Sequence, residues 1–232
     1  MKTTYFRKAD STELPSGATA EVYLIAVKID NVGGYAKELI GVLNNTSWIN
    51  DLNPVGRLTF ERTAKRSIDK LVVDFQTIQN AVTSSFGEYM VSMSAGQSLG
   101  VLLNHLVFPI SELWKEKLTN NHGFDFHTES QQQRLSFGEA KYNKTSNPYT
   151  EAAGQVIDFI NAGKDGGDAA LLSYFAKPES IENLLQGRRG FTVAFSIHSN
   201  NPENILSNAL NSDLIVKLCR ECDELQLVGV TS

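Results

Sequence analysis

Gly123-Phe-Asp-Phe-His127 and Leu135-Ser-Phe-Gly-Glu-Ala-Lys-Tyr142 are the two stretches that decide how this sequence folds. Apolar and polar residues alternate in both, which predicts two short β-strands, because alternate side chains of a strand point to the same side. The residues between them are polar and predict a turn, so the strands are expected to pair as a hairpin. In such a hairpin Asp125 can meet Glu139, and Lys141 shares a face with Glu139.

Two carboxylates held by a rigid sheet suit Mg²⁺ or Mn²⁺, which favour carboxylate, water and phosphate oxygens as ligands. Such an ion lowers the pKa of its bound water and neutralises charge that develops on a scissile phosphate. Lys141 would stand beside the ion as a point charge that positions the attacking water or stabilises the transition state. The alternative is an amphipathic hairpin with a surface ion pair between Lys141 and a carboxylate.

The order of Asp125, the Glu-x-Lys of Glu139 and Lys141, and a helical segment resembles the PD-(D/E)xK nuclease superfamily. This resemblance implies an α/β fold with a restriction-endonuclease-like core, in which helices flank a mixed central sheet. The core is expected to run helix, three strands, helix, strand. The resemblance also implies a hydrolase, a divalent-metal-dependent phosphodiesterase whose catalytic residues are Asp125, Glu139 and Lys141.

The first helix of that core often brings a further acidic ligand. Residues 85–92 and the apolar residues 99–107 predict this helix, with Glu88 as an acidic residue of its first turn. We expect Glu88 to join Asp125 and Glu139 as a metal ligand. An ordinary charge that favours the helix dipole is the alternative for Glu88, and Glu112 is the competing candidate.

A helix is also predicted after the Glu-x-Lys strand, over residues 148–160, with Pro148 in its opening turn. In several nuclease lineages of the superfamily a glutamine on this helix touches the metal site or the DNA. Gln155 is placed to act in this way. A glutamine that faces the solvent is the alternative.

Basic residues supply candidate contacts to nucleic acid. Lys115 and Lys117 lie close in sequence to the expected site, and Arg188 and Arg189 precede a predicted strand in a turn flanked by glycine. Residues 62–66 form the other dense basic patch. The alternative for each patch is a solvated surface.

A narrower resemblance is to the HamA family, the nuclease subunits of the Hachiman antiphage defence system. It is carried, over about residues 80–165, by Phe86-Gly-Glu-Tyr, Ser111-Glu-Leu-Trp-Lys-Glu-Lys-Leu, the two hairpin stretches and Ala153-Gly-Gln-Val. It implies a DNA nuclease effector of a bacterial defence complex, restrained by and delivered to DNA by a large superfamily 2 helicase of the HamB type. The alternatives are a catalytically idle interaction subunit of a helicase complex, or a nuclease with another nucleic-acid substrate.

The composition sets broader limits. The chain has 232 residues, of which 41% are apolar, and this is enough for a sizeable core. We expect a nuclease core over residues 81–232 and an α/β extension over residues 1–80 that is available to bind a partner. Long apolar runs and a secretory signal are absent from the sequence, so we expect a cytoplasmic protein with no membrane contact. A small-molecule cofactor is not expected either. A formal net charge of −5 means that a basic patch, the metal or a partner must offset repulsion from DNA.

The cysteines, one histidine and a glycine-rich stretch are three further features of the sequence. Cys219 and Cys222 form a Cys-x-x-Cys pair, but the neighbouring acidic residues disfavour a thiolate, so we read both as helix residues in a reducing compartment. His127 can reach the metal or a phosphate, with a structural role as the alternative. The glycine-rich residues 163–168 predict a flexible connection.

Secondary structure is predicted along the rest of the chain from hydrophobic period and turn residues. The expected elements are a loose arm over 1–17, a strand over 20–29, a helix over 36–43, a loop over 45–57, a segment of ambiguous period over 55–76, helical pieces over 169–175 and 181–185, a strand over 190–197, a helix over 202–218 and a strand over 225–230.

Overall fold

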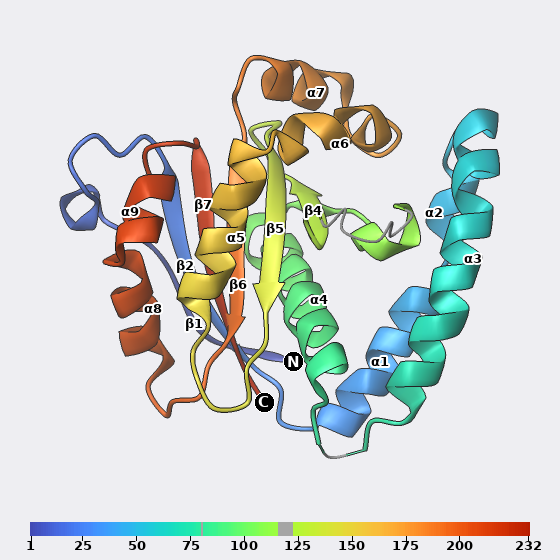
Figure 1. Cartoon of the computed structure of the whole chain (residues 1–232), viewed down its shortest axis with the longest axis horizontal. Helices are drawn as coiled ribbons and strands as arrows, with labels where there is room; N and C mark the ends of the chain where they lie inside the picture. The colour runs from blue at the N-terminus through green and yellow to red at the C-terminus, as the bar shows by residue number, and fades with distance from the viewer. Residues whose placement is uncertain (80, 116–122) are drawn as a thin grey trace.

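The computed structural model describes residues 1–79, 81–115 and 123–232 (Figure 1). The elements of the described part follow the chain as β1 (Lys2–Lys8), η1 (Ser11–Glu13), β2 (Glu21–Lys28), α1 (Val32–Asn44), α2 (Ser47–Asn50), α3 (Pro54–Gln76), α4 (Ser84–Leu103), β3 (Leu106–Val107), η2 (Ser111–Leu113), β4 (Phe126–Glu129), β5 (Leu135–Lys141), α5 (Tyr149–Asn161), α6 (Lys164–Leu172), α7 (Pro178–Leu185), β6 (Gly190–Ser196), α8 (Pro202–Leu210), α9 (Asp213–Leu218) and β7 (Glu224–Thr231).

The centre of the molecule is a curled, mixed sheet of seven strands in the order β1-β2-β7-β6-β5-β4-β3. The four inner strands β2, β7, β6 and β5 are parallel, whereas β1 at one edge and β4 and β3 at the other run antiparallel to their neighbours. The expected α/β class with a mixed central sheet is therefore confirmed.

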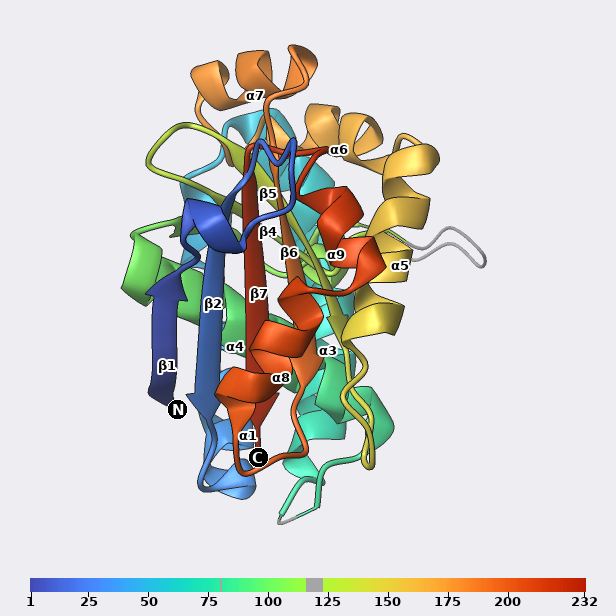
Figure 2. The ribbon, with the colours of Figure 1, turned by 90° about the vertical axis from the view of Figure 1, so that its left-hand side faces the viewer.

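Helices cover both faces of this sheet. Helix α4 packs across one face, against strands from β2 to β4, whereas α5 and α8 cover the other face and α9 packs beside α5 (Figure 2). Every residue of β6 is buried, as is typical of a parallel strand that is covered on both sides. Helix α4 is itself buried over most of its length, which explains why its apolar residues follow no single stripe.

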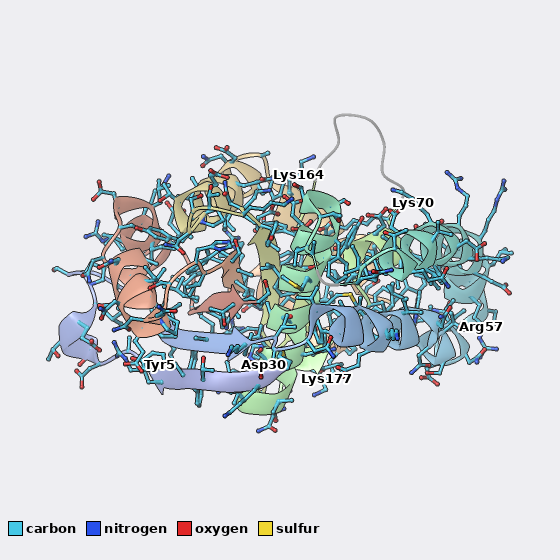
Figure 3. All side chains as sticks on the ribbon, turned by 90° about the horizontal axis from the view of Figure 1, so that it is seen from below. Tyr5, Asp30, Arg57, Lys70, Lys164 and Lys177 are labelled. Carbon is cyan, nitrogen blue, oxygen red and sulfur yellow. The ribbon has the colours of Figure 1, made fainter. Side chains whose placement is uncertain are left out.

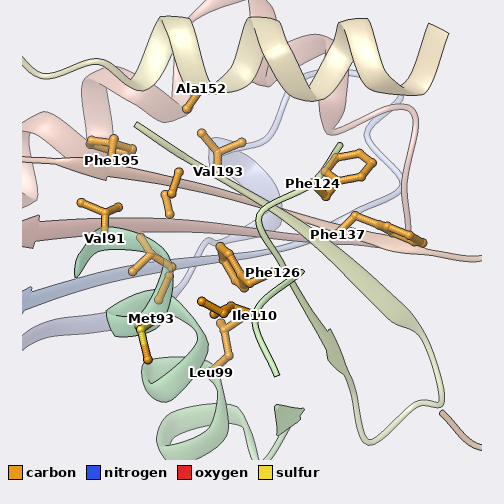
Figure 4. Packing of buried hydrophobic residues seen from close by; sticks show 14 of the residues in the cluster. Val91, Met93, Leu99, Ile110, Phe124, Phe126, Phe137, Ala152, Val193 and Phe195 are labelled. Carbon is orange, nitrogen blue, oxygen red and sulfur yellow. The ribbon is translucent and has the colours of Figure 1, made fainter. Parts of the chain in front are cut away.

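The core next to β5 is rich in aromatic side chains. The rings of Phe124 and Phe137 lie 5.2 Å apart, and Phe124 also meets Phe159 of α5 at 5.1 Å. On the α4 side, Phe126 packs near Leu99 (Figure 4). These contacts hold the β4–β5 hairpin between α4 and α5, and they fix the position of the segment that leads into β4.

Helices α1, α2 and α3 form a lobe beside α4, away from the central sheet (Figure 1). Helix α3 packs against α1, α2 and η2. Its buried residues recur at helical spacing, which fixes one side of the helix against the lobe; they are Gly56, Phe60, Ala64, Ile68, Leu71 and Phe75. The other side of α3 is not packed against the lobe, and part of it lies across a cleft from β5.

The N-terminal third differs most from the predictions. The loose arm over 1–17 is wrong, because Lys2–Lys8 forms the edge strand β1, whose backbone pairs with β2 although its side chains are largely exposed. The loop over 45–57 is also wrong, because α2 lies within it and α3 begins at Pro54. Asn53 caps that helix by accepting from the backbone N–H of Gly56 at 2.8 Å. Residues 54–76 are one helix.

Two further predictions need correction. Residues 163–168 are not a flexible connection, because α6 begins at Lys164 directly after Gly163, whose φ of 66° is one that glycine adopts without strain. The helix expected over 202–218 is two helices, α8 and α9, separated at Asn211 and Ser212. The other predicted strands, over 20–29, 190–197 and 225–230, are confirmed.

Strands from both sides of residue 80 share the central sheet, and the predicted division of the chain at this point stays a prediction. Within the described ranges, no helix has the length and apolar character that crossing a membrane would require.

Candidate active site

The β4–β5 hairpin is confirmed, and it fixes Asp125 directly before β4. The ladder pairs Phe126 with Gly138, and the backbone N–H of Asp125 donates to the carbonyl oxygen of Gly138 at 2.9 Å. The Oδ2 atom of Asp125 accepts from the backbone N–H of Ala140, also at 2.9 Å. Glu139 lies between these two contact points, so the hairpin brings the aspartate and the glutamate together as predicted.

Gly138 is needed for this geometry because the ring of Phe126 lies over its backbone. A Cβ atom at position 138 would lie 2.3 Å from Cζ of Phe126, which is closer than van der Waals contact allows. The glycine of the Phe-Gly-Glu stretch thus lets β4 and β5 pair closely beside the candidate carboxylates.

Glu139 is the most deeply buried carboxylate of the described cleft lining. Only 1% of the residue is exposed, its Oε1 accepts from Nζ of Lys141 at 2.8 Å, and its buried Oε2 has no hydrogen-bond partner among the described residues. Burial, and then the negative charge of Asp125, raise the pKa of Glu139 well above its ordinary value of 4.5. An ionised Glu139 therefore requires positive charge beyond that of Lys141.

Lys141 is half-buried and is held as a cation. Burial by itself would lower the pKa of Lys141, but the negative charges of Glu139, Glu88 and Asp125 outweigh it and leave the pKa above 10.5. The side chain therefore keeps its proton at neutral pH. It can supply a fixed positive charge, and it cannot act as a general base there.

These residues border a cleft of about 970 Å³ that reaches from β5 to α3. Its described lining carries five carboxylates and three lysines, so negative charge prevails. The charged lining residues are Glu88, Glu112, Asp125, Glu139, Asp168, Lys115, Lys141 and Lys164. Such an excess of carboxylates favours the binding of cations.

Glu88 lies on the cleft wall, one turn further into α4 than predicted. The helix begins at Ser84 and has no acidic residue in its first turn, so a favourable helix-dipole position does not account for Glu88. The preceding Gly87 allows a close approach of α4 to the end of β5, since a Cβ atom there would lie 2.2 Å from the ring of Tyr142. Glu88 is close enough to Glu139 that its charge contributes to raising the pKa of Glu139.

Glu112, the competing acidic candidate, lies on η2 and also borders the cleft. Its buried carboxylate accepts a hydrogen bond from the hydroxyl of Tyr89 and lies 3.6 Å from Nζ of Lys70. Burial, and then the bond to Glu112, raise the pKa of Tyr89, which therefore stays a neutral donor. Glu112 is thus engaged by the side chains of Tyr89 and Lys70.

The remaining candidates divide into two groups. Gln155 of α5 is half-buried and borders the cleft, as does Lys115, whose ammonium group is paired with Asp168. Arg188 and Arg189 are not among the residues of the cleft lining. They come directly before the N-terminal end of β6, whereas Lys141 lies beside the C-terminal end of that strand. Nε of Arg189 lies 3.0 Å from Asp165, and Arg188 donates to Gln186. Lys117 lies outside the described residues.

His127 has a structural role. It is fully buried, its Nδ1 lies 3.2 Å from Oγ of Ser111, and its Nε2 lies 3.2 Å from Oδ2 of Asp168. Burial lowers the pKa of His127 to about 4, so the imidazole is neutral at pH 7. It anchors α6 to η2 behind the cleft and is not part of the lining.

Sequence reasoning missed the residues that close the cleft at its far sides. Asp168 and Lys164 come from α6, and Thr59 and Thr63 come from α3. Helix α6 was not predicted because the glycines of residues 163–168 favour a flexible connection. Helix α3 was not predicted because the hydrophobic period of residues 55–76 is ambiguous. Asp168 lies in the glycine-rich stretch, and its acidic side chain was the only feature of the sequence that could have indicated a place in the site.

Cysteine chemistry takes no part in the site. Cys219 and Cys222 are buried with free thiols, and burial raises the pKa of Cys219 to about 11 and that of Cys222 further still. Both therefore remain neutral thiols, as expected. The prediction that both are helix residues is wrong, because α9 ends at Leu218 and both cysteines follow it.

The donor set fits a hard divalent ion with few protein ligands. In the described ranges, no group of three or more His, Cys, Asp or Glu side chains is arranged to hold a metal. Asp125 and Glu139 nevertheless offer carboxylate oxygens to one cleft, and one of these oxygens is buried without a partner. Mg²⁺ commonly takes one or two carboxylates and completes its shell with water and phosphate. Glu88 as a third ligand stays a prediction.

Comparison with known proteins found no matching family model, no matching curated protein and no matching solved structure. The geometry and the charge of the cleft are therefore the basis for assigning a function.

Proposed function

We propose that the chain is a divalent-metal-dependent nuclease whose site comprises Asp125, Glu139 and Lys141. The observation that carries this proposal is the buried, unpartnered Oε2 of Glu139 beside Asp125 in an open cleft. Burying an ionised carboxylate without full compensation is costly, and structural packing alone gives no reason to hold these charges together. A bound cation supplies that compensation.

Each residue of the site has a definite task in phosphodiester hydrolysis. Asp125 and Glu139 would hold Mg²⁺ or Mn²⁺, which supplies a more acidic bound water and neutralises charge on the phosphate. Asp125 is oriented for this by the N–H of Ala140, which occupies its Oδ2. Lys141, with its proton retained, orients the attacking water or stabilises the negative charge of the transition state.

The order of elements supports a PD-(D/E)xK-type core. Helix α4 is followed by β3, β4 and β5, then by α5 and, after α6 and α7, by β6. This order agrees with the helix, three strands, helix and strand that the sequence resemblance implies. Gln155 on α5 faces the same cleft as Glu139 and is proposed as an auxiliary residue.

The biological setting is proposed from the sequence resemblance alone. A DNA-degrading effector of a Hachiman-type antiphage complex would require a large superfamily 2 helicase as its partner. The net charge of −5 agrees with weak unaided binding to DNA at physiological salt. Co-purification of a superfamily 2 helicase with this chain, and faster cleavage in its presence, would support this part of the proposal.

The nuclease proposal is tested by pairing cleavage with metal binding. We expect the full chain to cleave labelled DNA in Mg²⁺ or Mn²⁺, to stop on chelation, and to fail when Glu139→Gln is introduced. Glu203→Gln, on the exposed side of α8, is the matched control and should remain active. Running RNA in parallel identifies the polymer.

A second measurement separates the nuclease from an idle interaction subunit. Mg²⁺ or Mn²⁺ should raise the melting temperature of the wild-type chain and of Glu203→Gln more than that of Glu139→Gln. A chain that shows neither cleavage nor metal stabilisation, with its helicase or without it, would be assigned to the idle alternative.

A further inference from the structure

One side of α3 belongs to the cleft. Thr59 and Thr63 both border it, and they lie one helical turn apart. At 100° per residue, Arg66 and Lys70 continue the same stripe toward the C-terminal end of the helix. Nζ of Lys70 lies 3.6 Å from Oε1 of Glu112, a lining residue, which places this end of the stripe at the cleft as well.

Arg62 adds a third positive charge one turn before Arg66. The side chains of Arg62, Arg66 and Lys70 are exposed, and no carboxylate of the described residues lies within ion-pair distance of either arginine. Lys65 differs from them, because it lies on the other flank of α3 and is paired with Asp69 at 3.1 Å. The cleft side of α3 therefore carries the less neutralised positive charge.

The length of this basic stripe suits a polyanion. Eight residues separate Arg62 from Lys70, which corresponds to about 12 Å along a helix. A nucleic-acid strand of a duplex carries one phosphate for every ~3.4 Å of axis, so the stripe spans roughly three or four phosphates. Lys70 on α3, which pairs with the lining residue Glu112, and Lys164 of the cleft lining on α6 lie toward the same side of the molecule (Figure 3).

We infer that the Arg62–Lys70 stripe of α3 binds the backbone phosphates of the nucleic-acid strand that enters the cleft. This inference rests on the proposed function, since it adds to the Asp125–Glu139 site the surface that holds its substrate. The carboxylate-rich lining repels phosphates, whereas the stripe attracts them on the opposite wall. The chain thus holds the strand by α3 and presents one phosphate to the two carboxylates.

The test compares neighbouring residues of α3. Arg66→Ala removes charge from the cleft side and Arg62→Ala from the solvent-facing edge of the stripe, whereas Lys65→Ala removes one charge from the other flank of the same helix. Each is introduced into the full-length Glu139→Gln chain, so that the probe, a fluorescent DNA oligonucleotide, is not consumed. Binding is followed by fluorescence anisotropy from low to physiological salt.

Counterion release predicts the size of the effect. Each lost phosphate contact should reduce the slope of log affinity against log salt by about 0.7 for a single strand or about 0.9 for a duplex. We expect this reduction for Arg62→Ala and Arg66→Ala and no change for Lys65→Ala. In a chain with an intact site, Arg66→Ala should raise KM for cleavage while kcat at saturating substrate is retained.

The outcomes separate the inference from the nuclease proposal. Equal salt slopes for Arg66→Ala, Lys65→Ala and the parent overturn the inference, even if the wild-type chain cleaves DNA. Binding that depends on Arg62 and Arg66, without any cleavage, upholds the strand-binding surface and overturns the nuclease. A parent chain that does not bind the oligonucleotide at low salt overturns the inference.

Discussion

Nζ of Lys141 lies 2.8 Å from Oε1 of Glu139, whereas Oε2 of the same carboxylate is buried and has no hydrogen-bond partner in the part of the chain that the structure describes. The lysine thus compensates only one side of a carboxylate that also experiences the negative charge of Asp125. The second oxygen has no such compensation among the described residues. The relationship has consequences for stability, metal binding and turnover that can be measured separately.

The metal-free chain should lose stability as the pH rises. The pKa of Glu139 is raised in the folded chain above 4.5, so the folded state keeps a proton that the unfolded state has released. The free energy of unfolding therefore falls between pH 4.5 and the folded pKa. Glu139→Gln should remove this loss and be more stable than the wild type at pH 8 in EDTA, as measured by urea unfolding. An unchanged pH dependence in Glu139→Gln would contradict this explanation.

Asp125 and Lys141 should differ in what their loss does to metal binding. Asp125→Asn removes ligand charge, so calorimetry should show weaker Mn²⁺ binding. Lys141→Ala removes a positive charge beside the ion, so binding should persist or tighten while cleavage falls by about 10²–10³. Lys37→Ala on α1 is an exposed control. Weaker metal binding in Lys141→Ala would show that the lysine supports the ion rather than the reaction.

The hairpin and its charged residues were predictable because their pattern is local. Alternation with period two fixed the strands around Asp125 and Glu139, and a shift of one residue would have moved those charges to the other face. The strands 190–197 and 225–230 were predictable because continuous apolar runs between turn residues are typical of inner parallel strands. In each case a short stretch of sequence contained the whole signal.

The far walls of the cleft were not predictable, because no local pattern records which segments meet in space. Pro54 and Asn53 favour a turn as well as the start of a helix, and here they start α3. Gly163 favours a flexible connection as well as a positive φ before a helix, and here it precedes α6. Edge strand β1 was missed because its pairing is made by the backbone and its side chains are mostly exposed.

Gly87 should be required for the approach of α4 to the end of β5. A Cβ atom at this position would overlap the ring of Tyr142, so Gly87→Ala should destabilise the chain by about 1–3 kcal/mol and displace Glu88. The cost should shrink in a Tyr142→Ala background, as a double-mutant cycle of unfolding free energies would show. Gly41→Ala, in the open surroundings of α1, is the control and should be neutral or stabilising. Equal costs of Gly87→Ala in both backgrounds would rule out the contact with Tyr142.

Acid should destabilise the chain through two buried histidines. Burial lowers the pKa of His105 and of His127 to about 4 from an ordinary value of 6.5. Between these values the unfolded chain binds protons that the folded chain does not, so stability is fully present above pH 6.5 and falls as the pH drops toward 4. Each histidine should contribute about 1.4 kcal/mol per pH unit within this window.

This acid effect is best measured in the Glu139→Gln chain, because ionisation of Glu139 changes stability in the opposite direction over part of the same range. His127→Gln should lower the free energy of unfolding at pH 7, since it disturbs the bonds to Ser111 and Asp168, and should also reduce its slope between pH 6.5 and 4. Urea unfolding at intervals of pH measures both quantities. An unaltered slope in His127→Gln would mean that His127 is protonated in the folded chain, so that its bond to Asp168 is an ion pair.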